Sequence, residues 1–174
     1  SLDYKNNLVV LELDHLKGKK HLQQVVLLQL IAQLNNEFYL GDRRVPKILL
    51  VDEAWEAFED PMVAKFLEGA FRRMRKAAAA PVVVTQSLRD LYNSASGEAI
   101  ANNAANVIVL RQNGEAIEAL KESGRFNIGD YGYEMLKSLH TEPGQYSEVL
   151  FRSGTAWDVG RFVVDRFSQL LYST

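Results

Sequence analysis

Short runs of apolar residues alternate with longer helical segments along most of this chain, and this alternation limits the folds it can adopt. The apolar runs are continuous, as parallel strands covered on both faces require. The segments between them have the length and apolar spacing of helices. We therefore predict an α/β fold with a mostly parallel sheet flanked by helices. The predicted strands are Leu8–Leu13, Val45–Val51, Pro81–Gln86 and Ala105–Gln112.

The clearest predicted helix follows Pro61, and its apolar residues recur at helical spacing from Val63 to Met74. An earlier predicted helix, His21–Leu40, is apolar on most of its circumference, so we expect it to pack against other layers on both sides. Further helices are predicted at Ser87–Asn93, Gly97–Asn103, Glu115–Glu122 and Ile128–Leu139.

The last part of the chain changes character. Residues 126–174 contain a helix and an alternating segment that turns at Ser153-Gly154, which is typical of a β-hairpin. At 174 residues the chain is long enough for one domain with a substantial core. We predict one domain, in which residues 1–125 form the α/β part and residues 126–174 form a helical and β-hairpin appendage.

The composition narrows the class of function. The net charge is −2, from 20 basic and 22 acidic residues, so direct nucleic-acid binding is not expected. The absence of cysteine excludes disulfides and thiolate metal sites. His15, His21 and His140 do not have metal-ligand spacing. The most apolar segment, Val25–Leu34, is too short to span a membrane.

Two adjacent carboxylates, Asp52 and Glu53, directly follow the apolar run Ile48–Val51. Ligands of α/β sheets gather at the carboxyl ends of the strands. In nucleotide hydrolases the first acidic residue of such a pair holds Mg²⁺ and the second activates the attacking water. The alternative is a strand that stops at solvent, with both carboxylates merely hydrated.

The next predicted strand also ends in polar residues, Thr85 and Gln86. An amide in this position can contact the γ-phosphate or position the attacking water. The alternative is that Gln86 caps the helix predicted to begin near Ser87. A phosphate-binding loop of the form G-x-x-x-x-G-K-[ST] is missing, because "GKK" at Gly18–Lys20 lacks the preceding glycine and the final Ser or Thr.

Several motifs together resemble the C-terminal ATPase domain of TraC-type conjugative transfer proteins, in the type IV secretion ATPase family. They are "VLELDHLKGKKHLQQVVLLQLIAQL", "PKILLVDEAWEAF", "RRMRK", "VVVTQSLRDLY", "VLRQNGEAIEALKESGRF" and "VGRFVVDRFSQLLYST". The resemblance implies a RecA-like P-loop NTPase fold, whose phosphate loop (Walker A) lies upstream of this segment in the family. Residues 1–125 would then be the P-loop-distal part of that domain. We expect both ends of the chain to be cut.

The resemblance also implies roles for the strand-end residues. Asp52 would hold Mg²⁺ directly or through water, Glu53 would be catalytic, and Gln86 would sense the γ-phosphate of ATP. These three residues would bind the ATP and Mg²⁺ cofactors.

Ring ATPases complete their sites with an arginine from a neighbouring subunit. Arg111, just past the fourth predicted strand, is our candidate for this catalytic role, although it could pair with a local carboxylate. Arg72, Arg73 and Arg75 are weaker candidates, because the solvated face of an amphipathic helix explains them.

The implied function is that of a motor ATPase, active as a hexamer in its full-length form, that drives pilus assembly and substrate transfer. It would be cytoplasmic, peripherally associated with the bacterial inner membrane, and would contact inner-membrane components of a secretion channel. The isolated chain is expected to be inactive, because it lacks the phosphate loop. The alternatives are a ring-shaped DNA translocase or coupling ATPase, which salt-dependent DNA binding would support, and a non-catalytic interaction module.

Overall fold

The computed structural model describes residues 6–16, 18–54 and 58–172, and its internal contacts group the chain into two compact units. The first unit comprises residues 1–84 and the second comprises residues 85–174. The predicted boundary between residues 125 and 126 falls inside the second unit. The division into an α/β part and a C-terminal appendage of the same domain stays a prediction.

The first unit is built on a parallel strand pair. Strands β1 (Lys47–Val51) and β2 (Ala79–Val83) pair in parallel, from Lys47 opposite Ala79 to Val51 opposite Val83. This pairing confirms that the second and third predicted strands exist, but the third begins at Ala79 and ends at Val83, three residues before Gln86. The other elements of the unit are η1 (Asp14–Leu16), α1 (Lys20–Asn35), the π-helical turn η2 (Asn36–Leu40), α3 (Pro61–Arg73) and the 3₁₀ turn η3 (Met74–Ala77).

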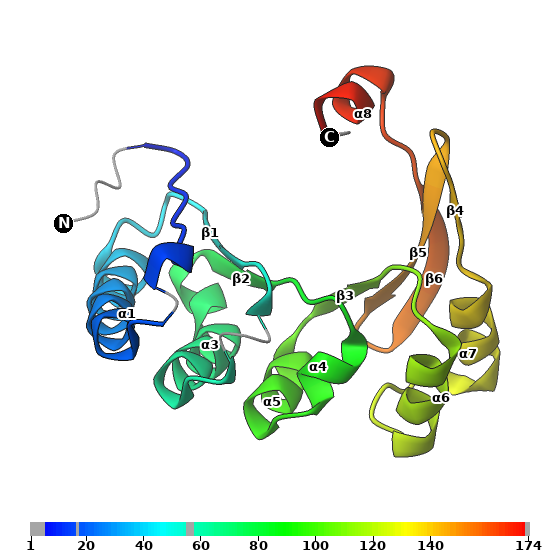
Figure 1. Cartoon of the computed structure of the whole chain (residues 1–174), viewed down its shortest axis with the longest axis horizontal. Coiled ribbons are helices and arrows are strands. Elements are labelled where there is room, and N and C mark those ends of the chain that lie inside the picture. The colour runs from blue at the N-terminus through cyan, green and yellow to red at the C-terminus, as the bar shows by residue number, and fades with distance from the viewer. Residues whose placement is uncertain (1–5, 17, 55–57, 173–174) are drawn as a thin grey trace. The chain divides into compact units, whose positions relative to one another are not determined.

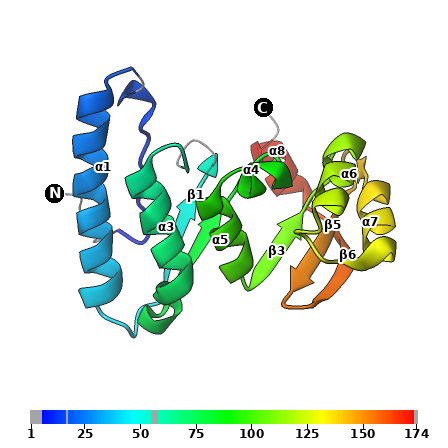
Figure 2. The ribbon, with the colours of Figure 1, turned by 90° about the horizontal axis from the view of Figure 1, so that it is seen from below.

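Helix α3 begins where the sequence predicted it would. The Asp60 side chain accepts hydrogen bonds from the backbone N–H groups of Met62 and Val63, and Pro61 occupies the first turn. Helix α3 contacts β2 and α1, and Figure 2 shows α1 and α3 side by side. The core of this unit contains Phe38, Ala70, Met74 and Ala79, with Leu34, Tyr39, Leu49 and Phe66 packed against it.

Two predictions for the first unit are wrong. Residues 8–13 form no strand, and Leu8 is 78% exposed. A strand needs a neighbouring strand to satisfy its backbone, and none pairs with this segment within the described residues. Helix α1, predicted to pack on both sides, has no buried residue among those described, although it contacts η1, η2 and α3. Among the described residues, no helix is long and apolar enough to cross a membrane.

The second unit contains an antiparallel sheet. Its strands are β3 (Asn106–Val109), β4 (Thr141–Glu142), β5 (Tyr146–Ser153) and β6 (Ala156–Phe162). Its helices are α4 (Leu88–Tyr92), α5 (Ala95–Asn103), α6 (Gly114–Ser123), α7 (Gly129–Ser138) and α8 (Arg166–Tyr172). The β5–β6 hairpin turns at Gly154, whose φ is +59°, and this confirms the predicted hairpin (Figure 1).

The mostly parallel sheet predicted from the sequence is therefore only partly correct. Strand β3, predicted as a fourth parallel strand, pairs antiparallel with β5. The buried side chains of Val109 and Leu150 lie opposite each other in this pairing. An apolar run indicates burial but not direction, and here the hairpin supplies the partner strand.

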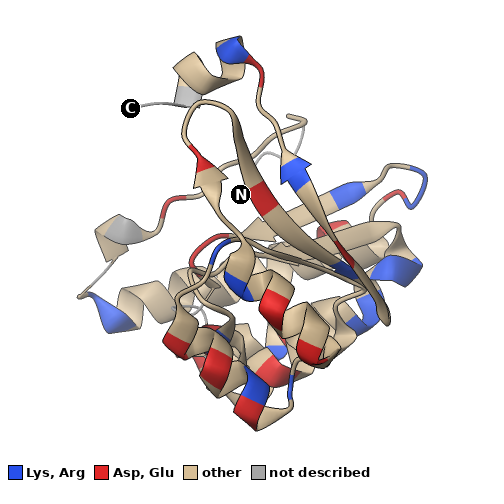
Figure 3. Ribbon diagram, turned by 90° about the vertical axis from the view of Figure 1, so that its right-hand side faces the viewer, with Lys and Arg blue, Asp and Glu red and all other residues tan. Residues whose placement is uncertain are grey.

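Basic and acidic residues are both present on the helices of the second unit (Figure 3), and those of α6 and α7 form ion pairs with one another. Lys121 Nζ lies 2.8 Å from Asp130 Oδ1, and Lys137 Nζ lies 2.6 Å from Glu118 Oε1. The hydrogen bond from Lys137 lowers the pKa of Glu118. Exposed ion pairs of this kind stabilise a fold only slightly, so the stability of this region depends on its buried contacts.

Tyr133 links α7 to the segment that precedes it through a buried polar contact. Its hydroxyl donates to the backbone carbonyl of Phe126, and the Leu120 carbonyl lies 3.4 Å away. Burial raises the pKa of Tyr133 still further above neutral pH, at which a tyrosine hydroxyl is already protonated. Phe126 is fully buried, and the Arg152 guanidinium lies over its ring at 4.8 Å.

We expect Tyr133→Phe to destabilise the protein by about 1–3 kcal/mol, because it leaves the buried Phe126 carbonyl without its donor. Tyr131→Phe is the matched control, since Tyr131 lies on the same helix and is largely exposed. Urea unfolding of both variants checks this. Equal stability of the two variants would contradict a structural role for the Tyr133 hydroxyl.

Candidate nucleotide site

Asp52 and Glu53 lie directly after β1, on a turn held at both ends by β2. The backbone N–H of Val84 donates to the Val51 carbonyl at 2.9 Å, and the N–H of Ala54 donates to the Val84 carbonyl at 3.0 Å. Both carboxylates are exposed, whereas Ala54 is fully buried. The carboxyl ends of β1 and β2 therefore meet at one edge, as the sequence predicted, with the acidic pair at that edge.

The turn has an unusual backbone conformation. Glu53 has φ of +47°, in the left-handed region that costs a residue with a β-carbon about 1–2 kcal/mol. Its N–H donates to Asp52 Oδ1 at 2.9 Å, so the Asp52 side chain supports this conformation. Strained residues held by their surroundings are concentrated at functional sites. This observation favours a functional interpretation of the acidic pair over two merely hydrated carboxylates.

The polar residues after β2 belong to the second unit. Thr85 is partly buried, and its hydroxyl donates to Asp90 Oδ2 at 2.8 Å. Gln86 is exposed. Ser87 is the N-cap of α4, since its side chain accepts from the N–H of Arg89. The alternative in which Gln86 caps this helix is therefore wrong.

The arginine candidates lie on different elements. Arg111 is exposed in the segment that follows β3. On α3, Arg72 forms an ion pair with Glu68 at 2.8 Å, and the Arg73 guanidinium lies 5.9 Å from the centre of the Tyr39 ring. These local partners favour a structural role for Arg72 and Arg73.

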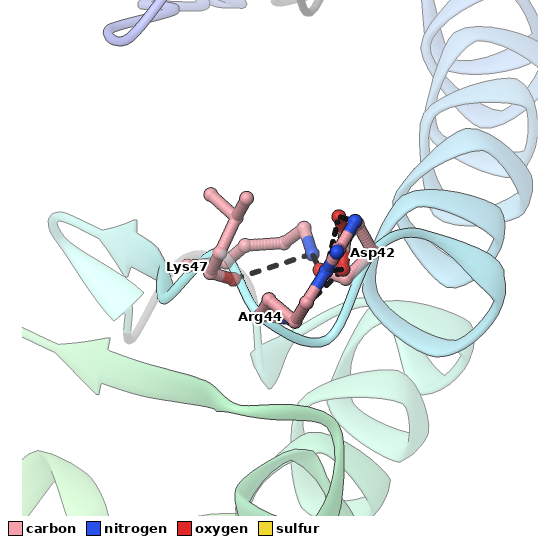
Figure 4. Close-up of polar contacts among 4 residues, drawn as sticks. Asp42, Arg44 and Lys47 are labelled. Atoms are coloured by element: carbon pink, nitrogen blue, oxygen red, sulfur yellow. Dashed lines mark hydrogen bonds and ion pairs between the residues drawn. The ribbon is translucent and has the colours of Figure 1, made fainter.

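A second charged cluster lies at the opposite end of β1 (Figure 4). Asp42 accepts hydrogen bonds from the backbone and guanidinium of Arg44, and Lys47 Nζ donates to the Asp42 carbonyl at 2.6 Å. The hydrogen bonds from Arg44 lower the pKa of Asp42. Because these contacts close the loop that leads into β1, we assign the cluster a structural role.

The acidic pair has the donor chemistry that Mg²⁺ requires. Mg²⁺ is commonly bound by one or two carboxylates together with water and substrate phosphates. One oxygen of Asp52 accepts from Glu53, and the carboxylate is otherwise exposed at the strand end. In the described part of the chain, no three acidic or histidine side chains form a metal cluster. His140 instead lies 2.8 Å from Glu148, within a hydrogen-bonded group that includes Tyr146.

Comparison with known proteins defines the class of this fold. Residues 2–166 match the family model of the TraG P-loop domain, and the chain therefore belongs to this family. Among curated proteins it is similar to Protein TraC of Escherichia coli (strain K12), with 29% identity over 181 residues. The match covers 96% of this chain and 20% of TraC, so the chain spans about a fifth of the length of that relative.

The fold is also similar to that of a solved structure, VirB4 of Thermoanaerobacter pseudethanolicus. The TM-score is 0.72 at 21% sequence identity, and the match covers 97% of this chain and 44% of VirB4. This likeness supports the predicted α/β class of fold. The sheets observed in this chain are one parallel pair and one antiparallel sheet.

Sequence reasoning found the acidic pair but missed two features around it. The left-handed conformation of Glu53 had no signal in the sequence, because glycine and asparagine are the residues usual there. The hydrogen bond between Thr85 and Asp90 was partly predictable from the sequence. In "TQSLRD", Ser87 and Asp90 have the spacing of a capping box, which places the Asp90 carboxylate beside the start of the helix.

The left-handed conformation of Glu53 predicts that glycine is more stabilising than alanine at this position, the reverse of the usual order. Glu53→Gly should be more stable than Glu53→Ala by about 0.5–1 kcal/mol, because only glycine adopts the left-handed region without cost. Ala78→Gly is a positive control, since Ala78 has φ of +52° and lies away from the carboxylates. Urea unfolding measures all three variants. A more stable Glu53→Ala would argue against the observed backbone.

Proposed function

We propose that this chain is part of the motor ATPase of a conjugative type IV secretion system. The observation that carries the proposal is the match to a P-loop domain family over residues 2–166. The similarity to TraC and VirB4 supports the secretion context. In the assembled protein, ATP hydrolysis would drive pilus assembly and substrate transfer.

The proposed chemistry uses the residues at the strand ends. The Glu53 carboxylate accepts the proton of the water that attacks the γ-phosphate. Asp52 provides the carboxylate for Mg²⁺, which supplies positive charge beside the phosphates when it is bound. The Gln86 amide contacts the γ-phosphate or the attacking water, and Arg111 stabilises transition-state charge at the site of a neighbouring subunit.

This chain carries no G-x-x-x-x-G-K-[ST] sequence, so the cradle for the β- and γ-phosphates must come from elsewhere in the polypeptide. We propose a longer protein that supplies this loop, works as a hexamer and associates peripherally with the inner membrane from the cytoplasm. Its partners would be inner-membrane components of the secretion channel. The chain by itself would be inactive.

The acidic pair is tested in the longer protein. Glu53→Gln should bind ATP and lose hydrolysis, because the amide keeps the size of the side chain but accepts no proton from water. Asp52→Asn should also weaken Mg²⁺-dependent nucleotide binding. Nucleotide affinity and single-turnover hydrolysis measure the two effects separately. Hydrolysis at the wild-type rate in both variants would remove the pair from the site.

Gln86 is tested against the true cap of α4. Gln86→Ala should lower the hydrolysis rate by about 10²-fold and leave ADP affinity unchanged, because ADP lacks the γ-phosphate. Ser87→Ala is the matched control, which should cost about 1 kcal/mol of stability with near-normal turnover per folded molecule. The measurements are melting temperature and single-turnover hydrolysis on the same preparation. A destabilised Gln86→Ala variant with normal turnover would contradict the sensing role.

A further inference from the structure

The carboxylate of Asp90 holds the residues on both sides of Gln86. Its Oδ2 atom accepts one hydrogen bond from the Thr85 hydroxyl at 2.8 Å and another from the Ser87 backbone N–H at 3.1 Å. Both donors share a single oxygen atom. The residue before Gln86 and the residue after it are therefore tied to one point.

Asp90 is itself held by a short helix. The Asp90 N–H donates to the Ser87 carbonyl at 3.1 Å, and the Ser87 side chain caps the first turn of α4. At the other end of α4, the Arg125 guanidinium donates to the Tyr92 carbonyl at 2.7 Å. A helix of five residues is not stable alone. The capping bonds at the first turn hold Asp90, and the bond from Arg125 restrains the last turn separately.

The bond to Thr85 goes beyond what capping requires. A capping box needs only the reciprocal bonds between the N-cap residue and the third helical residue. The Thr85 hydroxyl is outside that box, on the far side of Gln86. Hydrogen bonds to a carboxylate are stronger than those between neutral groups, so this contact restrains the Gln86 backbone as well as the helix end.

We propose that Asp90 is a positioning residue for Gln86. By holding Thr85 and Ser87, it keeps the Gln86 backbone in the one arrangement from which the amide meets the γ-phosphate or the attacking water. This inference rests on the proposed role of Gln86. It adds a residue that contacts no nucleotide and acts because a polar group contributes most to catalysis when it is oriented in advance.

The test uses the intact polypeptide that contains this chain. Asp90→Ala and Thr85→Val should each slow single-turnover ATP hydrolysis per folded molecule, by about 10–100-fold for Asp90→Ala, with ADP affinity unchanged. Thr85→Val keeps the shape of the side chain and removes only the donor. Asp90→Asn keeps an oxygen that can accept both bonds and should retain most of the activity.

Two further comparisons separate positioning from a general loss of structure. In a Gln86→Ala background, Asp90→Ala should cause no additional loss of hydrolysis, because its effect passes through Gln86. Arg125→Met is the control that releases the other end of α4 and leaves the Asp90 contacts intact, and it should turn over normally per folded molecule.

The outcomes distinguish the positioning role of Asp90 from the proposed sensing role of Gln86. Losses from Asp90→Ala and Gln86→Ala that multiply, or normal hydrolysis in Asp90→Ala and Thr85→Val, would overturn the positioning role while Gln86 keeps its own. A loss in Arg125→Met equal to that in Asp90→Ala would overturn it too. Normal hydrolysis in Gln86→Ala would reject the proposed sensing site and the positioning role together.

Discussion

The parallel pairing of β1 with β2 is the constraint on which the acidic pair depends. The pairing continues past the strands, through the bonds of Val84 with the Val51 carbonyl and the Ala54 N–H. Ala54 is fully buried, so the chain has to return to β2 immediately after Asp52 and Glu53. A turn this tight is achieved by placing Glu53 in the left-handed region, and the Asp52 side chain stabilises it. The same geometry leaves both carboxylates exposed.

Hydrogen bonds restrain the chain after both strands, but the groups that form them differ. After β1, both carboxylates are exposed, and the turn is restrained by backbone bonds to Val84 together with the Asp52 side chain. After β2, side chains form the restraining bonds: Thr85 donates to Asp90, and Ser87 caps α4. Thr85 and Ser87, the polar residues on either side of Gln86, therefore both form hydrogen bonds that hold α4 and its first turn. Gln86 is the exposed residue between them.

Local signals in the sequence predicted local structure well. The periodicity after Pro61, the apolar run before Asp52 and the turn at Gly154 correspond to α3, β1 and the β5–β6 hairpin. Predictions that required a distant partner did worse. The run Leu8–Leu13 has the composition of a strand, but no strand among the described residues pairs with it. The apolar residues of β3 could not reveal that its partner is the antiparallel β5.

The candidate site shows the same difference between features that are local in the sequence and contacts between distant segments. The carboxylates could be predicted because a charged pair after an apolar run is visible in the sequence, whereas the restraints on them come from hydrogen bonds between segments. The boundary between the two compact units falls between Val84 and Thr85. Val84 takes its partners from the first unit, and Thr85 takes its partner, Asp90, from the second. The peptide bond that joins them is therefore where restraint by the strand pair ends and restraint by α4 begins. On the proposed function, the acidic pair and Gln86 both act on hydrolysis, but each is held in place by its own set of contacts.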